Sequence, residues 1–402
     1  MLLRKFLRAQ SRLYVGYYAG TIIICSEIFG CMKVAILSTA YPLRGGIAQF
    51  NGLLYREFEK DHEVKMFTFK RQYPNFLFPG ETQYVTEDDD ADPIPSTEIL
   101  DTVNPFSYWK TAKEINKYNP DVLITKYWMT FFAPSLGTVL KRSKNAKRIS
   151  ILDNVIPHEK RFFDAPANRY FLKHNDGFVV MSDVVMNDLL SIKPDAKYLR
   201  IDHPVYNQFG ASIPKDEAIA ALNLPKGKKF LLFFGFIRKY KGLDLLIESL
   251  NSLDEDYHVI VAGEVYGSFD DYQALIDKHG LQDRVHKFNQ YISDEEVKTY
   301  FSAADVCMLP YKSATQSGIT AIAHHFEMPI IATDVGGLKE SIEHQTTGLI
   351  VDKADPVEIA SSVKAFFNDF DPKAMRTAIR KTNEENTWEK FSKRIIEFAE
   401  TL

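Results

Sequence analysis

Short apolar runs that alternate with longer amphipathic stretches constrain this chain more than any other feature of its sequence. Residues 33–38 (KVAILS) and 229–234 (KFLLFF) are almost continuously apolar, as expected for strands buried on both faces of a parallel sheet. The apolar runs that follow them are separated by stretches suited to helices. Strand and helix in regular alternation predict an α/β fold built on doubly wound parallel sheets.

The alternation comes in two series, separated by residues 201–217, where Pro, Gly and polar residues mix as in an interdomain linker. A chain of 402 residues is long enough for two domains with substantial cores. We therefore predict two Rossmann-like domains, over residues 32–205 and 206–385, followed by a C-terminal helix over residues 386–402.

The expected elements follow from the same pattern. Residues 70–84 are predicted to form a long loop at the top of the first sheet, and the acidic residues 87–97 an exposed connector. Strands are expected over residues 33–38, 62–69, 120–128, 147–154, 176–182, 229–234, 257–267, 283–292, 305–311, 329–335 and 349–352. The principal helices are expected near residues 47–59, 107–117, 133–144, 183–191, 242–249 and 388–401, with two helical segments ending the chain.

Residues 1–31 fit neither series. Four basic residues precede an uncharged run over residues 13–26, which is too short to span a bilayer comfortably. The pattern is similar to a signal sequence, yet no small-residue cleavage site follows, and Met32 begins a typical opening strand. We expect an upstream start codon chosen in error or a weak membrane-surface anchor, in preference to export.

Composition and missing motifs exclude several classes of protein. A net charge of −4 and a pI near 6.2 give no overall attraction for nucleic acid. Cys25, Cys31 and Cys307 have neither metal-ligand spacing nor a disulfide pattern, which favours a reducing cytoplasm. No G-x-G-x-x-G follows the first strand and no G-x-x-x-x-G-K-[ST] occurs, which argues against dinucleotide oxidoreductases and P-loop NTPases.

No metal site is expected. The dipeptide His158-Glu159 lacks a second histidine four residues from the first, so the metalloprotease pattern fails. His324 and His325 are adjacent on a predicted helix, where neighbouring side chains point in different directions, so packing is the favoured interpretation.

Two stretches of the second series are suited to binding an anion. The turn SATQSG at residues 313–318 opens a helix, whose unpaired N–H groups and dipole favour a phosphate; an ordinary strand–helix loop is the alternative. Arg238 and Lys241 lie just past a strand end, beside Gly235 and Gly242, where a solvated basic loop is the alternative. Both loops are expected at the carboxyl edge of one sheet, where they would meet a shared diphosphate.

Five stretches together resemble the retaining glycosyltransferases of family 4, which use nucleotide-sugar donors. They occur in the family's order from residue 32 to residue 388, nearly the whole chain: MKVAILSTAYPLRGGIAQF, GFIRKYKGLDLLIESL, VIVAGE, DRVHKFNQYISDEEVKTYFSAADVCMLPY and MPIIATDVGGLKESIEHQTTGLIV. The resemblance implies the GT-B fold, in which two Rossmann-like domains face each other across a cleft. It also implies that the C-terminal helix returns to the N-terminal domain.

The resemblance assigns roles to several residues. Gly45 and Gly46 match the glycine loop near the donor phosphates and the acceptor, where a missing side chain lets substrate approach the backbone. Lys241 matches the lysine that pairs with the donor diphosphate. His158 ends a strand at which the family often has a histidine near the transferred sugar, with a loop or N-capping histidine as the alternative.

Three positions depart from the family pattern. The arginine expected directly after Gly235 is Phe236, so Arg238 is the predicted substitute. Two glutamates eight positions apart, which normally face the donor sugar and the nucleotide ribose, are replaced by Ala314 and Ile322 when the chain is aligned on Pro329.

The remaining contacts to the donor are expected from the turn itself and from one carboxylate. Backbone amides need no side chain to bind phosphate, and Thr315, Gln316 and Ser317 would supply polar contacts. Glu264, after the VIVAG strand, is a candidate beside the nucleotide, with a helix-start glutamate as the alternative. The amides expected to bind phosphate are those of Gln316, Ser317, Gly318 and Ile319.

The implied activity is transfer of a sugar from a UDP- or GDP-sugar to a hydroxyl acceptor with retention of configuration, without a cofactor. His158, Arg238 and Lys241 would be the catalytic residues. The acceptor, a glycan or lipid-linked glycan of bacterial polysaccharide synthesis, would bind to loops 40–50, 70–84 and 126–134. Contact of residues 76–78 (FLF) with lipid would make the protein peripheral at the inner face of the plasma membrane.

Two other functions stay open. A non-catalytic member that binds a nucleotide sugar is suggested by the replaced glutamates. A GT-B sugar-nucleotide 2-epimerase would need carboxylates in the cleft for proton abstraction, which Ala314 and Ile322 do not provide.

Overall fold

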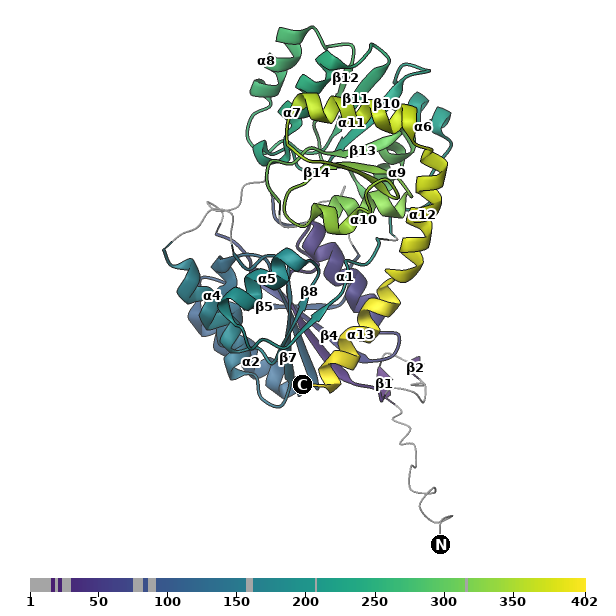
Figure 1. Cartoon of the computed structure of the whole chain (residues 1–402). Coiled ribbons are helices and arrows are strands. Elements are labelled where there is room, and N and C mark those ends of the chain that lie inside the picture. The colour runs from purple at the N-terminus through teal and green to yellow at the C-terminus, as the bar shows by residue number, and fades with distance from the viewer. Residues whose placement is uncertain are drawn as a thin grey trace.

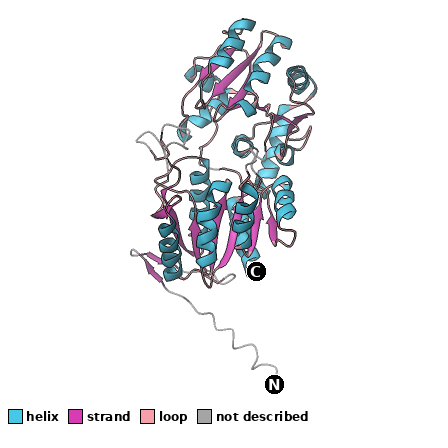
Figure 2. Ribbon diagram, turned by 90° about the vertical axis from the view of Figure 1, so that its left-hand side faces the viewer, coloured by secondary structure: helices cyan, strands magenta, loops and turns pink. Residues whose placement is uncertain are grey.

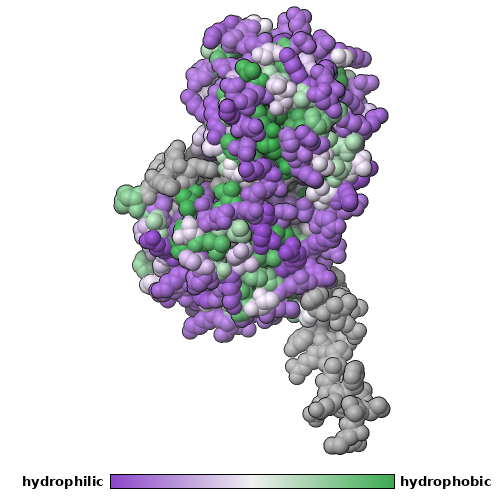
Figure 3. Space-filling view, viewed as in Figure 1, coloured by the Kyte–Doolittle hydropathy of each residue, from purple (hydrophilic) through white to green (hydrophobic). Residues whose placement is uncertain are grey.

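The computed structural model describes residues 16–18, 21–23, 30–74, 82–85, 92–156, 162–206, 208–314 and 317–402. The helices and strands form two domains, one above the other in Figure 1, with the C-terminus on the lower, N-terminal domain. Hydrophilic side chains cover most of the face of both domains seen in Figure 3. Within the described residues, no helix is both long and apolar enough to cross a bilayer.

The N-terminal domain is a seven-stranded parallel sheet with helices packed against it (Figure 2). The strand order β5-β4-β3-β6-β7-β8-β9 places the first strand of the series inside the sheet, so the chain winds first to one side and then to the other. The strands are β3 (Lys33–Leu37), β4 (Glu63–Arg71), β5 (Ser96–Asp101), β6 (Val122–Tyr127), β7 (Lys147–Leu152), β8 (Gly177–Val180) and β9 (Tyr198–Arg200). The helices are α1 (Gly46–Phe58), α2 (Pro105–Tyr118), η2 (Thr130–Phe132), α3 (Ala133–Arg142), α4 (Asp164–Lys173) and α5 (Asp183–Ile192).

The C-terminal domain repeats this plan with six parallel strands in the order β12-β11-β10-β13-β14-β15. The strands are β10 (Lys229–Phe234), β11 (Tyr257–Ala262), β12 (Val285–Phe288), β13 (Val306–Leu309), β14 (Ile330–Thr333) and β15 (Gly348–Val351). The helices before β15 are α6 (Lys215–Ala221), η3 (Lys239–Lys241), α7 (Leu243–Ser249), η4 (Leu250–Ser252), α8 (Asp270–His279), α9 (Asp294–Ala303), α10 (Gly318–His325) and η5 (Leu338–Ser341). The helices α11 (Pro356–Asp369), α12 (Pro372–Glu385) and α13 (Trp388–Glu400) end the chain, and a short hairpin, β1 (Gly16–Tyr18) and β2 (Thr21–Ile23), precedes the first domain.

The predicted fold class is confirmed, with differences at the edges of the first sheet and at the end of the chain. The edge strands β5 and β9 were not predicted, and the connector expected over residues 87–97 ends inside β5. Edge strands this short carry too few apolar residues for a clear period. Helix α4 was also missed, and three helices follow β15 instead of two.

Helix α13 ties the end of the chain to the N-terminal domain. A Cβ placed on Gly177 of β8 would lie 2.7 Å from the ring of Phe398 and 2.6 Å from Leu402, so the helix lies directly on the backbone of that strand. Trp388, at the start of α13, packs against Phe50 of α1 with 5.0 Å between ring centres. The C-terminal helix therefore returns to the first domain, as the resemblance implied.

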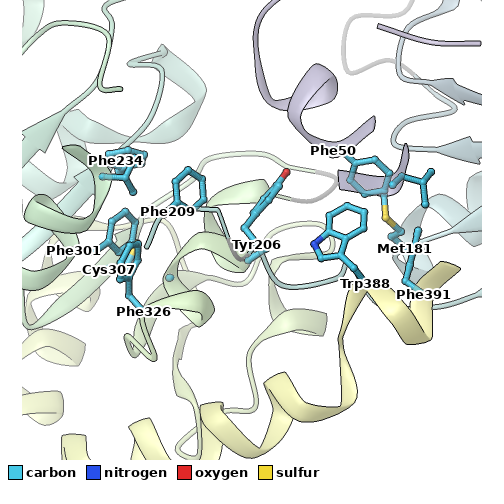
Figure 4. Packing of buried hydrophobic residues seen from close by; sticks show 14 of the residues in the cluster. Phe50, Met181, Tyr206, Phe209, Phe234, Phe301, Cys307, Phe326, Trp388 and Phe391 are labelled. Atoms are coloured by element: carbon cyan, nitrogen blue, oxygen red, sulfur yellow. The ribbon is translucent and has the colours of Figure 1, made fainter. Parts of the chain in front are cut away.

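A single apolar cluster continues from one domain into the other (Figure 4). Phe50 and Trp388 begin it on the N-terminal side, Tyr206 and Phe209 of the linker carry it across, and Phe326 continues it in the C-terminal domain. Because this cluster excludes water between the domains, it holds the two domains in one relative position, with the carboxyl edges of their sheets facing each other.

Candidate active site

The glycines predicted to approach a substrate lie at the carboxyl edge of the first sheet. Gly45 has φ +104°, a conformation that side chains rarely adopt, and precedes α1. A Cβ at Gly45 or Gly46 would meet no atom within 4 Å. The two glycines therefore leave open space above the backbone at the start of α1, which points toward the C-terminal domain (Figure 1).

Three predicted residues of the C-terminal domain come together at one point. A Cβ on Gly235, which has φ +89°, would lie 3.0 Å from the Ile319 side chain and 3.3 Å from Nζ of Lys241. Gly235 and Lys241 follow β10, and Ile319 opens α10 after β13, the adjacent strand. The chain changes winding direction between β10 and β13, which is where open α/β sheets bind ligands.

Lys241 is the most unusual cation in the described part of the chain. Its side chain is only 7% exposed, and its amine has no hydrogen-bond or ion-pair partner among the described residues. Burial and then the charge of Arg238 lower the pKa of Lys241 to about 8. A buried ammonium without a counter-charge is costly, so this position favours an incoming anion.

Close backbone packing holds the Lys241 loop in place. Gly242 has φ +70°, and a Cβ there would lie 1.9 Å from the carbonyl oxygen of Pro310, at the end of β13. Lys312 N also donates to the carbonyl of Tyr240 at 2.7 Å. The two anion-binding loops predicted from the sequence are therefore packed directly on each other.

Arg238 lies beside Lys241 and faces the other domain. Its guanidinium carbon is 3.9 Å from the ring centre of Tyr266. Its charge opposes the rise that burial causes in the pKa of Tyr73, which follows β4 in the N-terminal domain. Phe236, at the position of the expected arginine, is 47% exposed.

The turn before α10 is partly described. Ser317 caps α10, and its hydroxyl accepts from the Ile319 amide at 3.3 Å, so that amide already has an intramolecular partner. The Ser317 and Gly318 amides donate to no acceptor in the described part of the chain. Of the other predicted residues, Thr315, Gln316 and His158 lie outside the described residues.

The replaced family glutamates leave an apolar wall. Ala314 is 9% exposed and Ile322 packs against the apolar cluster that joins the domains. Tyr206 of the linker adds a hydroxyl near this wall, since a Cβ on Gly318 would lie 4.0 Å from Tyr206 Oη. Burial raises the pKa of Tyr206, so this hydroxyl is neutral and can donate a hydrogen bond.

Glu264 faces a cation that the sequence reasoning missed. Its Oε2 is 3.8 Å from Nη2 of Arg44 in the N-terminal domain, and that oxygen is buried without a hydrogen bond to any described residue. Arg44 also lies 5.2 Å from the ring centre of Tyr291 and donates through Nε to the carbonyl of Thr82. Arg44 directly precedes the two glycines, but only the tertiary structure shows what it faces.

A cavity of about 140 Å³ opens between the domains beside Arg44. Gln49 of α1 lines it and donates to both carboxylate oxygens of Asp294, another lining residue, at 2.8 and 3.0 Å. Its walls also include Gly45, Gln208 and Tyr291. A larger cavity of about 610 Å³ lies between α13 and residues 200–202, and none of the predicted site residues lines it.

No three His, Cys, Asp or Glu side chains are grouped to hold a metal ion within the described ranges. His324 is buried, which lowers its pKa to about 4, and Nε2 of His325 lies 2.8 Å from the carbonyl oxygen of Gly210. The two histidines therefore face different surroundings.

Comparison with known proteins agrees with this geometry. Residues 214–386 match the family described as "Glycosyl transferases group 1", so the resemblance read from the sequence is confirmed over that range. The chain is similar to a D-inositol 3-phosphate glycosyltransferase of Arthrobacter, with 32% identity over 37% of each chain. It is also similar to the lipopolysaccharide core biosynthesis mannosyltransferase LpsB of Rhizobium meliloti, with 30% identity over 40% of this chain and 48% of that enzyme.

Solved structures match over almost the whole chain. A glycosyltransferase from Rickettsia africae has a TM-score of 0.73 at 19% identity, covering 93% of this chain and 99% of that one. Anabaena HepE in complex with UDP-glucose has a TM-score of 0.72 at 15% identity, covering 92% and 100%. These likenesses show that the two domains have the GT-B arrangement.

Proposed function

We propose that this chain, whose C-terminal domain matches the group 1 glycosyl transferases, transfers a sugar from a nucleotide diphosphate sugar to a hydroxyl acceptor with retention of configuration. The observation that supports the proposal most directly is the buried amine of Lys241, which has no hydrogen-bond or ion-pair partner among the described residues and lies beside Gly235 and the start of α10. An anion there would remove the cost of the uncompensated charge.

In this mechanism Lys241 and Arg238 stabilise the negative charge that grows on the departing diphosphate. Both cations are held by packing, Lys241 through the neighbouring Gly242, whose backbone lies against the Pro310 carbonyl, and Arg238 on the Tyr266 ring. They would need little reorganisation as the glycosidic bond breaks, which is the condition for effective electrostatic catalysis. The departing oxygen would take the acceptor proton on the same face of the sugar, so no protein nucleophile and no cofactor are assigned.

The other predicted residues complete the donor site in this proposal. His158 would lie near the transferred sugar, and Thr315, Gln316 and the amides of Ser317 and Gly318 near the phosphates. Glu264 would face the nucleotide, and Gly45 and Gly46 the reacting groups. Closure of the cleft would exclude water.

The acceptor is proposed to be a glycan or a lipid-linked glycan, used by a cytoplasmic enzyme in peripheral contact with the membrane. The curated relatives are named for D-inositol 3-phosphate and for the lipopolysaccharide core, both of which carry hydroxyl groups. Residues 76–78, predicted to touch lipid, lie outside the described residues.

The first test is a thermal-shift screen with UDP, GDP and their sugars, because a ligand that binds only the folded protein raises its melting temperature. The second measures release of nucleoside diphosphate from the stabilising donor. Lys241→Ala should abolish release, whereas Lys239→Ala, at an 87% exposed neighbour paired with Asp271, should retain it. A donor that binds without turnover would indicate the non-catalytic alternative. Conversion of the donor to its C2 epimer would indicate the epimerase. If no nucleotide stabilises the protein, the proposal is refuted.

A further inference from the structure

One face of α2 presents aromatic and basic side chains to solvent. Its buried residues are Ser107, Tyr108, Thr111, Ala112 and Ile115, so the opposite side of the helix points outward. That outward stripe consists of Phe106, Trp109, Lys110, Lys113 and Lys117, at the spacing that places side chains on one helix face. Phe106 is 77% exposed and Trp109 52% exposed.

The stripe continues onto the end of the neighbouring helix α3. The guanidinium carbon of Arg142 lies 4.8 Å from the ring centre of Trp109. Asn116 of α2 connects the two helices. Its side-chain Nδ2 donates to the carbonyl of Arg142 at 3.0 Å, and its Oδ1 accepts from the Lys144 backbone amide at 2.8 Å. We call the outward residues of both helices the α2–α3 surface.

The charge of the α2–α3 surface is opposite to that of the whole chain. Residues 103–118 and 133–144 contain six basic residues and one acidic residue, Glu114, a net charge of +5, whereas the whole chain carries −4. None of the six basic side chains forms an ion pair with a carboxylate in the described part of the chain. The six are Lys110, Lys113, Lys117, Lys141, Arg142 and Lys144.

We propose that the α2–α3 surface binds an anionic lipid bilayer. Trp and Phe are stable at the level of the lipid headgroups, and lysines around them extend their amines to anionic phosphates while their stems cover apolar surface. Each basic residue near such a membrane strengthens binding about fivefold. Exposed rings beside cations can also stack single-stranded bases, but a helix whose outward face combines Trp and Phe with several lysines is typical of helices that lie on a lipid surface.

The aromatic end of this surface adjoins the cleft. Thr102, just before α2, donates through Oγ1 to the carbonyl of Gln72 and accepts from the hydroxyl of Tyr108. The next residue, Tyr73, is the one whose pKa is affected by the charge of Arg238 in the other domain. Bound through α2 and α3, the protein would therefore hold the acceptor side of the cleft near the lipid headgroups. This orientation rests on the proposed function, whereas the assignment of membrane binding to the α2–α3 surface rests on its exposed rings and its cations.

The experiment is sedimentation of the full chain with vesicles of phosphatidylcholine alone or with about one third phosphatidylglycerol. We expect binding to the anionic vesicles only, and its loss when salt rises from about 0.1 M to about 1 M, because the Debye length falls from ~10 Å to ~3 Å. The triple variant Lys110→Gln, Lys113→Gln, Lys117→Gln should bind about a hundredfold more weakly. Phe106→Ser with Trp109→Ser should also lose binding.

A matched control places the same substitutions elsewhere. Lys278, Lys364 and Lys373 are exposed lysines of the C-terminal domain, and their triple Gln variant should bind vesicles like the original protein. All variants should keep the melting temperature and the nucleotide-induced shift, which separates membrane binding from folding and from the donor site. No binding to anionic vesicles, equal binding by the α2 variants, or retention on a polynucleotide but not on vesicles would overturn the proposal.

Discussion

Glu340 of the C-terminal domain forms an ion pair with Arg200 of the N-terminal domain, with 3.1 Å between Glu340 Oε2 and Arg200 Nη2. The same carboxylate accepts from the amides of Asp183, at 2.5 Å, and Val184, at 3.3 Å, in the first turn of α5. Glu340 therefore caps a helix that belongs to the other domain. A carboxylate at a helix N-terminus is stabilised by the unpaired N–H groups and the helix dipole.

This contact predicts that Glu340→Gln weakens the interface between the two domains. The variant should lower the free energy of unfolding by about 1–2 kcal/mol, because the helix loses a charged cap and Arg200 loses a partner. Asp202→Asn is the control, since Asp202 contacts Arg200 at 2.6 Å within one domain and is 56% exposed; its cost should stay below about 0.5 kcal/mol. Urea unfolding measures both, and equal losses would contradict the role of Glu340 between domains.

The low pKa of Lys241 predicts that nucleotide affinity depends on pH. The free amine loses its proton near pH 8, so above that value binding of a diphosphate must also take up a proton. The affinity for a nucleoside diphosphate should fall about twofold from pH 7 to pH 8 and then by up to about tenfold per pH unit. Isothermal titration calorimetry in buffers of different ionisation enthalpy measures the affinity and the proton uptake together.

Two controls separate Lys241 from other causes of this pH dependence. A nucleoside without phosphates should bind with no slope above pH 8, because it makes no contact with the ammonium. Lys241→Arg should remove the slope, because a guanidinium stays charged throughout this range. A slope that persists in Lys241→Arg would assign the titration to a different group.

Arg238 and Lys239 are adjacent cations that should behave differently. Arg238 is half-buried over Tyr266 and acts on the pKa of Lys241, whereas Lys239 is 87% exposed and paired with Asp271. Arg238→Ala should weaken diphosphate binding by about 10- to 100-fold, the usual loss for a hydrogen bond to a charged group. Lys239→Ala should change it less than about twofold. Similar losses in both variants would show that only general positive charge attracts the ligand.

Gly242 and Gly280 form a matched pair for testing how the Lys241 loop is held. Both have left-handed backbones, with φ +70° and +64°, but a Cβ on Gly242 would meet Pro310 O at 1.9 Å, while one on Gly280 meets nothing within 4 Å. Gly280→Ala should cost about 1 kcal/mol of stability from the backbone conformation alone. Gly242→Ala should cost at least about 3 kcal/mol and weaken diphosphate binding, as measured by thermal unfolding and the nucleotide-induced shift. Equal costs would mean that the loop can move away from β13.

The local pattern of the chain determined much of the fold. Buried parallel strands such as KVAILS and KFLLFF form continuous apolar runs because both of their faces are covered, so their positions along the chain could be predicted. Gly235 and Lys241 could be placed at a strand end for the same reason. Edge strands β5 and β9 and helix α4 were not predicted, because short or half-exposed elements show little hydrophobic periodicity in the sequence.

The pairings across the domain boundary could be decided only by the tertiary structure. Arg44 with Glu264, Gln49 with Asp294 and Glu340 with Arg200 join residues that are 140 to 245 positions apart and lie in different domains. The polar or charged character of each residue was visible in the sequence, but no local rule states which group it meets. That depends on how the apolar cluster through Tyr206 and Trp388 positions one domain against the other. The sequence alone determined the chemistry available at each strand end, and the packing between domains decided which of those groups face one another.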